Sequence, residues 1–309
     1  MSQIHTPILL KESIEYLNLK EGDIVVDATV NRGGHSIEIA KKIGERGILI
    51  CIDLDNKALS EAKIFLEKNL KDNNFISPKI FYINDNFRNI KSILENLNIK
   101  NINALFADLG VSSQEIDISG RGFTFQKNEP LLMTLKDNVD EDTLTAEKIL
   151  NNWSEESLAD IIYYYSDEKY GKRIARNIVL ERENKEIKTT FDLVEIISKS
   201  VPEFYKKGKI HFATKTFQAI RIAVNDELRA EEELLKSLSE ILNNKSRASF
   251  LTFHSGEDRV LKRIIKENKD KLKLLKINKN KDFLEPSIEE IKRNPRSRSS
   301  KLRVIEKIN

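Results

Sequence analysis

The sequence predicts an α/β fold that is interrupted by a helical insert, and three observations support this. Apolar runs of strand length alternate with helical patterns through the first third of the 309 residues. After residue 110 helical patterns follow one another without a comparable strand, and a strong strand pattern returns near residue 247. We therefore expect one α/β domain, residues 1–112 and 209–309, with an inserted helical domain of residues 113–208.

The first third contains four apolar runs of strand length: "IVVDAT" (24–29), "ILICIDLD" (48–55), "KIFYIND" (79–85) and "INALFADLG" (102–110). Helical patterns follow the first three of them, at about 34–43, at about 57–70 and in "FRNIKSILENL". Strand and helix alternation of this kind indicates right-handed βαβ units. The expected result is a parallel sheet with helices on both faces.

The later elements are read in the same way. Helices are expected in the insert, and one long helix is expected from about residue 210, in "FATKTFQAIRIAVNDELRAEEELLKSLSEIL". The remaining elements are, in order, the strand "RASFLTFHS" (247–255), the helix "EDRVLKRIIKEN" and the strand candidates "KLKLLKIN" and "KLRVIEKI".

Composition excludes some classes of protein. No apolar run approaches the roughly 20 residues of a membrane span, and the N-terminus carries no export pattern. The single cysteine, Cys51, lies in an apolar run and cannot pair within the chain, so we expect a cytoplasmic protein without a membrane partner. The formal charge of +3 does not by itself indicate nucleic acid. The run "KRNPRSRSSKLR" (292–303) has six basic residues and no acid; a solvated tail and a phosphate-binding segment both fit it.

Acidic residues close three of the predicted strands. Asp27, Asp53 and Asp108 end the first, second and fourth strands, and ligands of open parallel sheets bind beyond such ends. Asp53 follows Gly33 by twenty residues, the spacing at which an acid reaches the ribose hydroxyls of a nucleoside. The loop "NRGGH" fits neither G-x-G-x-x-G nor a P-loop, and Asp27 would repel a pyrophosphate. A positively charged nucleoside such as S-adenosylmethionine fits better; the alternative is that Asp27 and Thr29 only cap a turn.

Eight blocks resemble, in order, the signature of one family: "HTPILLKESIEYL", "DATVNRGGHS", "CIDLDNKAL", "FADLGVSSQEID", "RGFTF", "KIHFATKTFQAIRIAVNDEL", "TFHSGEDRVLKR" and "NPRSRSSKLR". The family is the bacterial RsmH (MraW) ribosomal RNA cytosine-N4-methyltransferases, and the match runs from about His5 to Arg303. The resemblance implies a Rossmann-like, seven-stranded class I methyltransferase fold with an inserted substrate-recognition domain. It also implies S-adenosylmethionine as methyl donor and a cytosine in the decoding centre of 16S ribosomal RNA as acceptor.

The resemblance places functional residues on this chain. Cofactor contacts fall on Gly33, Gly34, His35, Asp53, Phe87 and Asp108, with Glu115 as a further candidate. Asp27 is a candidate from the charge argument above. The N4 amine of cytosine is a poor nucleophile, so catalysis needs mainly positioning and a hydrogen-bond acceptor; the candidates are Asp108, Ser112 and Ser113. For both serines, turn formation is the alternative.

RNA contacts are expected at Arg121 and Phe123 in "GRGFTF" and at Arg296 and Arg298 in the basic run. Core packing is the alternative for Phe123 and for its neighbour Phe125. The expected partner is 16S ribosomal RNA in the small ribosomal subunit, bound by a monomer or a homodimer. No cluster of residues has the spacing of a metal site.

The chain departs from the family pattern at three places. Asn31 replaces the first glycine of the loop, Glu115 stands where the family has a cofactor-contacting Gln, and "PLLMTLK" replaces two acids and a base by Leu132, Thr134 and Lys136. Asn31 and the altered "PLLMTLK" favour a rival interpretation, a non-catalytic RNA- or ribosome-binding descendant that keeps the cofactor pocket. A nicotinamide-dependent oxidoreductase fits poorly, because the phosphate-binding glycines are missing.

Overall fold

The computed structural model describes residues 7–112, 116 and 118–308. The chain divides into two compact units: an α/β unit, Met1–Gly110 with Arg229–Asn309, and a helical unit, Val111–Leu228. The helical unit therefore extends about one helix beyond the expected end at residue 208. The reason is that α11 (Thr214–Asn225) places Phe217 and Ile220 in the apolar core of the helical unit.

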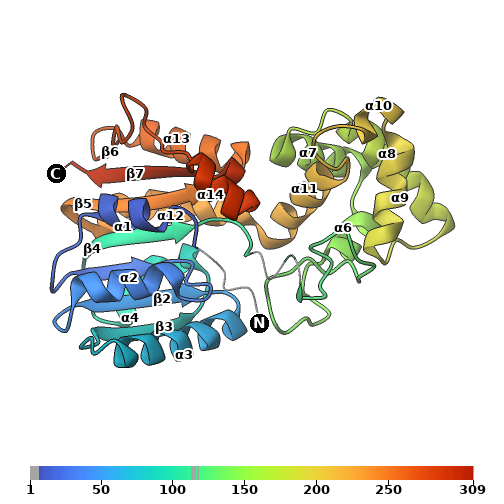
Figure 1. Cartoon of the computed structure of the whole chain (residues 1–309). Helices are drawn as coiled ribbons and strands as arrows, with labels where there is room; N and C mark the ends of the chain where they lie inside the picture. The colour runs from blue at the N-terminus through green and yellow to red at the C-terminus, as the bar shows by residue number, and fades with distance from the viewer. Residues whose placement is uncertain (1–6, 113–115, 117, 309) are drawn as a thin grey trace. The chain divides into compact units, whose positions relative to one another are not determined.

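A seven-stranded sheet forms the centre of the α/β unit, in the order β3-β2-β1-β4-β5-β7-β6 (Figure 1). Its strands are β1 (Ile24–Asp27), β2 (Ile48–Asp53), β3 (Lys79–Asn84), β4 (Ile102–Asp108), β5 (Leu242–Thr252), β6 (Leu272–Leu274) and β7 (Lys301–Lys307). Strands β1 to β5 pair in parallel, whereas β7 runs antiparallel to both β5 and β6. The expected seven-stranded α/β fold is confirmed, with a mixed rather than wholly parallel sheet.

Helices cover both faces of this sheet because its strands are apolar on both sides. Successive residues alternate, so that Val25 of β1 lies in one apolar cluster and Val26 in the other. The first cluster includes α1 (Leu10–Leu17), α2 (Gly34–Ile43) and α3 (Asn56–Asp72). The second includes α4 (Ile90–Asn96), α12 (Glu227–Ile241) and α13 (Ser255–Glu267).

The helical unit has a core of its own, built by α6 (Ala146–Asn152), α7 (Glu155–Ser166), α8 (Gly171–Asn184), α9 (Thr190–Ser200), α10 (Glu203–Lys206) and α11. The prediction of one long helix from residue 210 was wrong. Asp226 adopts φ 50, a left-handed conformation that ends α11, and α12 begins at Glu227. A bidentate ion pair between Arg221 and Glu227, at 2.8 and 2.7 Å, joins the two helices across this break.

The basic run at residues 292–303 is folded, so the solvated tail was the wrong alternative. It comprises the end of α14 (Ile288–Arg293), the short helix η2 (Pro295–Ser299) and the first residues of β7. Arg303, only 2% exposed, pairs with Asp258 at 2.5 Å and with Asp282 at 2.9 Å.

Two other expectations concern the single cysteine and membrane-spanning helices. Cys51 is buried in β2 as a free thiol, and burial raises its pKa well above the ordinary value. In the described ranges, no helix combines the length and the apolar character that crossing a bilayer would require.

Candidate active site at the carboxyl ends of the strands

The three strand-end acids lie on three neighbouring strands of the α/β unit. Asp53, Asp27 and Asp108 are the last residues of β2, β1 and β4, and β1 pairs in parallel with both of the others. All three therefore reach the same edge of the sheet, as the sequence predicts. This is the edge at which open parallel sheets bind ligands.

Asp27 is fully buried at the centre of this edge. Its carboxylate accepts a 2.5 Å hydrogen bond from the Ser36 hydroxyl and a 3.2 Å bond from the Thr29 amide. Burial outweighs these bonds and raises the pKa of Asp27 from 3.8 to about 6. The turn-capping contact that we considered as the alternative is thus present, and it involves a carboxyl group held away from water.

Asp53 organises the loop that follows β1. Its carboxylate accepts hydrogen bonds from the backbone amides of Asn31, at 2.8 Å, and Asp55, at 3.0 Å. Asn31 adopts φ 48, and Gly33, which precedes the first turn of α2, adopts φ 78. Asn tolerates this left-handed region better than most residues, so the loss of the family's glycine leaves the turn in place.

Gly34 and His35, the first two residues of α2, pack against the beginning of the described chain. A Cβ at Gly34 would lie 2.4 Å from Cγ of Pro7, a distance that no side chain permits. The His35 Nε2 lies 3.1 Å from the carbonyl oxygen of Ile8, and its ring packs on Phe106 of β4 with centroids 4.2 Å apart. The structure thus gives the His35 ring a packing role, and its predicted contact with a cofactor stays a prediction.

Asp108 has the most unusual environment of the three acids. Its backbone amide donates to the Thr29 hydroxyl at 2.6 Å. Its Oδ1 atom is buried and has no hydrogen-bond partner in the described part of the chain. Burial, followed by the negative charges of Asp27 and Glu257, raises the pKa of Asp108 from 3.8 to about 8. A buried acceptor without a donor is costly unless a ligand supplies one.

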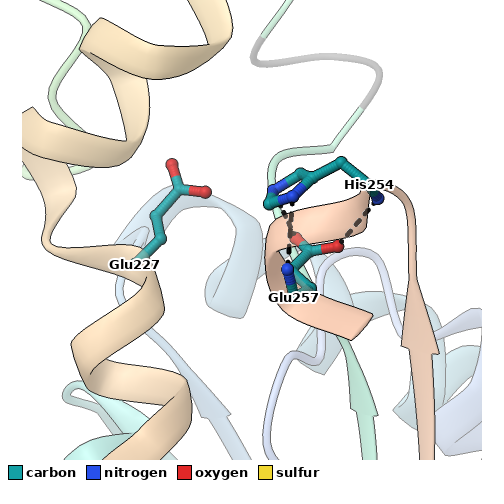
Figure 2. Close-up of side chains that lie close together, drawn as sticks. All are labelled: Glu227, His254 and Glu257. Atoms are coloured by element: carbon teal, nitrogen blue, oxygen red, sulfur yellow. Dashed lines mark hydrogen bonds and ion pairs between the residues drawn. The ribbon is translucent and has the colours of Figure 1, made fainter. Parts of the chain in front are cut away.

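Glu257, which the sequence analysis missed, lies at the start of α13 (Figure 2). Its carboxylate accepts the backbone amides of Phe253 at 2.6 Å and His254 at 3.2 Å, while His254 Nδ1 accepts the Glu257 amide at 3.3 Å. This is a capping box with histidine in place of the usual Ser or Thr. The spacing of three residues between His254 and Glu257 is the sequence signal that could have indicated this capping box. Glu227, also drawn in Figure 2, begins α12 and pairs with Arg221.

The other cofactor and catalytic candidates are not among the strand-end residues of the sheet. Phe87 lies in the short helix η1 (Phe87–Asn89) and packs, half-buried, against the second apolar cluster. Ser112 belongs to the helical unit, and its carbonyl oxygen accepts the Ile116 amide at 3.3 Å. Ser113, Glu115 and the predicted signature residue His5 lie outside the described residues.

Among the RNA candidates, Phe123 is only 8% exposed and belongs to the core of the helical unit, so core packing was the correct alternative for it. Arg121 lies 5.8 Å from the Phe123 ring centroid and donates to the Lys136 carbonyl oxygen at 3.2 Å. Its guanidinium group is thus engaged within the same unit. Arg296 and Arg298, by contrast, are exposed on η2 in the α/β unit.

The altered segment "PLLMTLK" is integrated into the helical unit. Leu131, Met133 and Thr134 are buried. The Asn225 side chain donates to the Met133 carbonyl oxygen at 2.8 Å and accepts the Leu135 amide at 2.9 Å. Apolar burial and backbone hydrogen bonds thus hold this segment without the acids and the base of the family pattern.

The groups at the sheet edge fit a cationic nucleoside. Asp108 offers a buried acceptor to which no described residue donates, and Asp27 adds a second carboxyl group nearby. This environment favours positive charge and disfavours phosphate. The strand order with one antiparallel strand, and the left-handed loop after β1, are those of a class I methyltransferase.

Comparison with known proteins gives the family. Residues 2–308 match the MraW methylase family. A relative from Finegoldia magna, named ribosomal RNA small subunit methyltransferase H, is 42% identical over 98% of each chain. A relative of the same name from Thermosipho melanesiensis is 43% identical, also over 98% of each chain. A solved rRNA methylase from Streptococcus thermophilus is similar only remotely, with a TM-score of 0.45 and 11% identity over 99% of this chain and 100% of that one.

The chain belongs to the MraW methylase family. It is therefore a methyltransferase, and S-adenosylmethionine is its methyl donor.

Proposed function

We propose that this methyltransferase modifies the N4 amine of a cytosine in the decoding centre of 16S ribosomal RNA. One observation carries the ribosomal RNA part of the proposal: relatives about 40% identical over nearly the whole chain are named ribosomal RNA small subunit methyltransferase H. The resemblance of the eight sequence blocks supports the finer statement of base, atom and region.

Asp108 would be the acceptor that positions the target amine. The lone pair of this amine is delocalised into the cytosine ring, so the reaction depends on alignment and on a hydrogen bond that localises the electrons. The buried Oδ1 of Asp108 can receive an amine N–H. A pKa of about 8 keeps this group protonated at neutral pH in the cofactor-free chain. Once a cationic cofactor has ionised it, the carboxylate could also accept the proton that the amine loses on methylation. S-adenosylmethionine would supply a methyl group on a positively charged sulfur.

Exposed cations lie at the same edge of the α/β unit as these acids. The first residue of β7, Lys301, pairs with Thr252 at the end of β5, and β5 also pairs with Asp108 of β4. The segment just before β7 therefore ends at the carboxyl edge of the sheet. Its exposed basic residues are Lys292, Arg293, Arg296 and Arg298. Such a group can bind RNA phosphates near the site of methyl transfer, with an affinity that falls as salt rises.

Mass mapping of 16S ribosomal RNA from a strain that lacks the gene tests the proposal. Complementation with the wild-type chain should restore one methyl group on a decoding-centre cytosine, whereas Asp108→Asn should not. Calorimetry with S-adenosylmethionine on the purified protein completes the test. If the wild-type chain binds the cofactor but restores no methyl mark, the non-catalytic RNA-binding alternative is correct.

A further inference from the structure

Aromatic rings and a lysine gather at one place on the helical unit, between the loop that joins α7 to α8 and the short helix α10. The Lys169 ammonium group lies 5.1 Å from the ring centroid of Tyr170, 5.2 Å from that of Tyr205 and 5.8 Å from that of Phe204. These distances are within the range of cation–π attraction. One cation is therefore shared by three rings from two separate segments.

The base of this cluster is fixed. Glu168 is fully buried and accepts a 2.6 Å hydrogen bond from the Tyr205 hydroxyl and a 2.9 Å bond from the Tyr170 amide. The two tyrosine rings pack edge to face, with centroids 5.0 Å apart. Burial and the Glu168 carboxylate raise the pKa of Tyr205, so that its hydroxyl keeps the donated proton. The loop and α10 are thus held together.

Phe204 is the exception within the cluster, because 68% of its surface is exposed. The residues that follow it continue the positive charge. Lys206 pairs with Glu203 at 2.6 Å, whereas Lys207 and Lys209 are exposed, and no ion pair to either is found among the described residues. An exposed aromatic ring on a fixed base therefore has one cation, Lys169, over it. Two further exposed lysines, Lys207 and Lys209, follow it three and five residues later in the chain. The acids at this place are the buried Glu168, the paired Glu203 and the exposed Asp167.

We propose that this surface, defined by Lys169, Phe204, Lys207 and Lys209, binds single-stranded RNA. A nucleobase would stack on the open face of Phe204, and the lysines would contact the flanking phosphates. Binding of single strands combines these two elements, and stacking tolerates any base because every base has a π-face. The excess of positive charge favours RNA over a second copy of this chain, which would bring the same lysines together. The inference rests on the proposed function, because it adds a second contact to the same substrate.

The test compares Phe204→Ala with a matched control, Phe191→Ala. Phe191 lies on α9 of the same unit and is 48% exposed, and among the described residues no cation lies over its ring. Affinity is measured by fluorescence anisotropy with a labelled single-stranded oligoribonucleotide of roughly 12 nucleotides from 16S ribosomal RNA. Phe204→Ala should weaken binding about 5- to 100-fold, the range expected for one stacked base, and Phe191→Ala by no more than about two-fold. Unfolding curves show whether both variants are folded.

A second pair of variants separates the lysines from the ring. The double variant Lys207→Ala/Lys209→Ala should weaken binding. It should also make the slope of log affinity against log salt concentration less steep, by the amount expected for the loss of about two phosphate contacts. Phe204→Ala should leave that slope unchanged. Unchanged affinity in Phe204→Ala overturns the inference, and so does a wild-type chain that does not bind single-stranded RNA. A change in sedimentation instead of RNA affinity would show that the surface joins two copies of the chain.

The two proposals fail in different ways. If the wild-type chain restores the methyl mark but Phe204→Ala binds RNA normally, only the inference fails. If Phe204→Ala loses RNA affinity but no cytosine is methylated by the wild-type chain, only the proposed reaction fails.

Discussion

Two buried carboxyl groups of the α/β unit, Asp258 and Asp108, respond to burial in opposite ways. Burial alone would raise the pKa of Asp258, but its hydrogen bonds to Arg303 and Lys262 lower that pKa below the ordinary value. The Oδ1 of Asp108 has no such partner in the described chain, and its pKa rises to about 8. The same side-chain type is thus a stable anion at one place and a neutral acid at neutral pH at the other.

The two acids differ in whether the fold supplies a partner for the buried carboxyl group. Asp258 joins α13 to β7 through Arg303, and both charges are compensated within the fold. Asp108 ends β4 with a buried acceptor that no donor among the described residues satisfies. Each unit of raised pKa corresponds to roughly 1.4 kcal/mol at a pH where the group would otherwise be ionised. We interpret this cost in stability as the consequence of a site kept ready for a positively charged or hydrogen-donating ligand.

The largest effect is expected where the compensated pair is broken. Arg303→Met leaves the buried Asp258 with the exposed Lys262 and the half-buried Lys301 as its remaining cations in the described chain, and should reduce the free energy of unfolding by about 3–5 kcal/mol. Urea denaturation measures this. Lys262→Met, which removes a partner that is 48% exposed, is the control and should change stability by less than about 1 kcal/mol. Equal effects of the two substitutions would show that burial of Arg303 does not matter.

Substitution of Asp108, the buried acid without a paired cation in the described chain, should raise the free energy of unfolding. The pKa of Asp108 is about 8 in the folded chain and 3.8 in the reference state, so its contribution to stability is full below pH 3.8 and is lost as the pH rises to 8. Asp108→Asn replaces the titrating carboxyl group, so the variant does not lose this stability as the pH rises. Without cofactor, the variant should exceed the wild type by a few kcal/mol at pH 8 and by almost nothing near pH 4.

Denaturation at several pH values, combined with methyl-transfer assays, measures both consequences of Asp108→Asn. The stabilised variant should transfer methyl groups at least about 10²-fold more slowly. A variant that is less stable than the wild type at pH 8 would contradict this account of Asp108.

A smaller effect is expected at the loop after β1. Asp53→Ala should weaken S-adenosylmethionine binding by roughly 1–3 kcal/mol, because it leaves ribose hydroxyls and the amides of Asn31 and Asp55 without an acceptor. Calorimetry gives this value. Glu61→Ala is the control, since Glu61 of α3 forms a partly exposed ion pair with Arg32 of the loop after β1. Unchanged affinity in Asp53→Ala would remove Asp53 from the binding site.

The smallest effect concerns Asn31 itself. Its φ of 48 suits glycine, so Asn31→Gly should change the free energy of unfolding by less than about 1 kcal/mol. Asn31→Val puts a branched side chain into the left-handed region and should destabilise the chain by about 1–2 kcal/mol. Thermal unfolding distinguishes the two, and a Val variant as stable as the Gly variant would show that the loop has another conformation in solution.

Local patterns predicted much of the α/β unit. The helix expected at 34–43 is α2, and Asp27, Asp53 and Asp108 each end a strand, because apolar periodicity and a following polar loop are properties of neighbouring residues. The acceptor role of Asp108 was a hypothesis from its position. The sequence could not show its raised pKa, because burial and the charge of Glu257 come from distant segments.

The features that the sequence left open or missed depend on contacts between segments that are distant in the chain. The sequence does not reveal that Arg303 is paired, since its partner Asp258 lies 45 residues away in the chain. The left-handed Asp226 breaks a helical pattern that is otherwise continuous, and the fold selects that break. Core packing of Phe123 was a recognised alternative, but only the assembled helical unit shows that the ring is enclosed.

The most direct test of the central claim counts the protons exchanged when the cofactor binds. Titration calorimetry at pH 7, in buffers of different ionisation enthalpy, gives this number for S-adenosylmethionine. If Asp108 is protonated in the free protein and ionises beside a bound cation, the wild type should release close to one proton per cofactor, and Asp108→Asn markedly less. Binding without proton release in the wild type, or with the same release in both chains, would contradict the account.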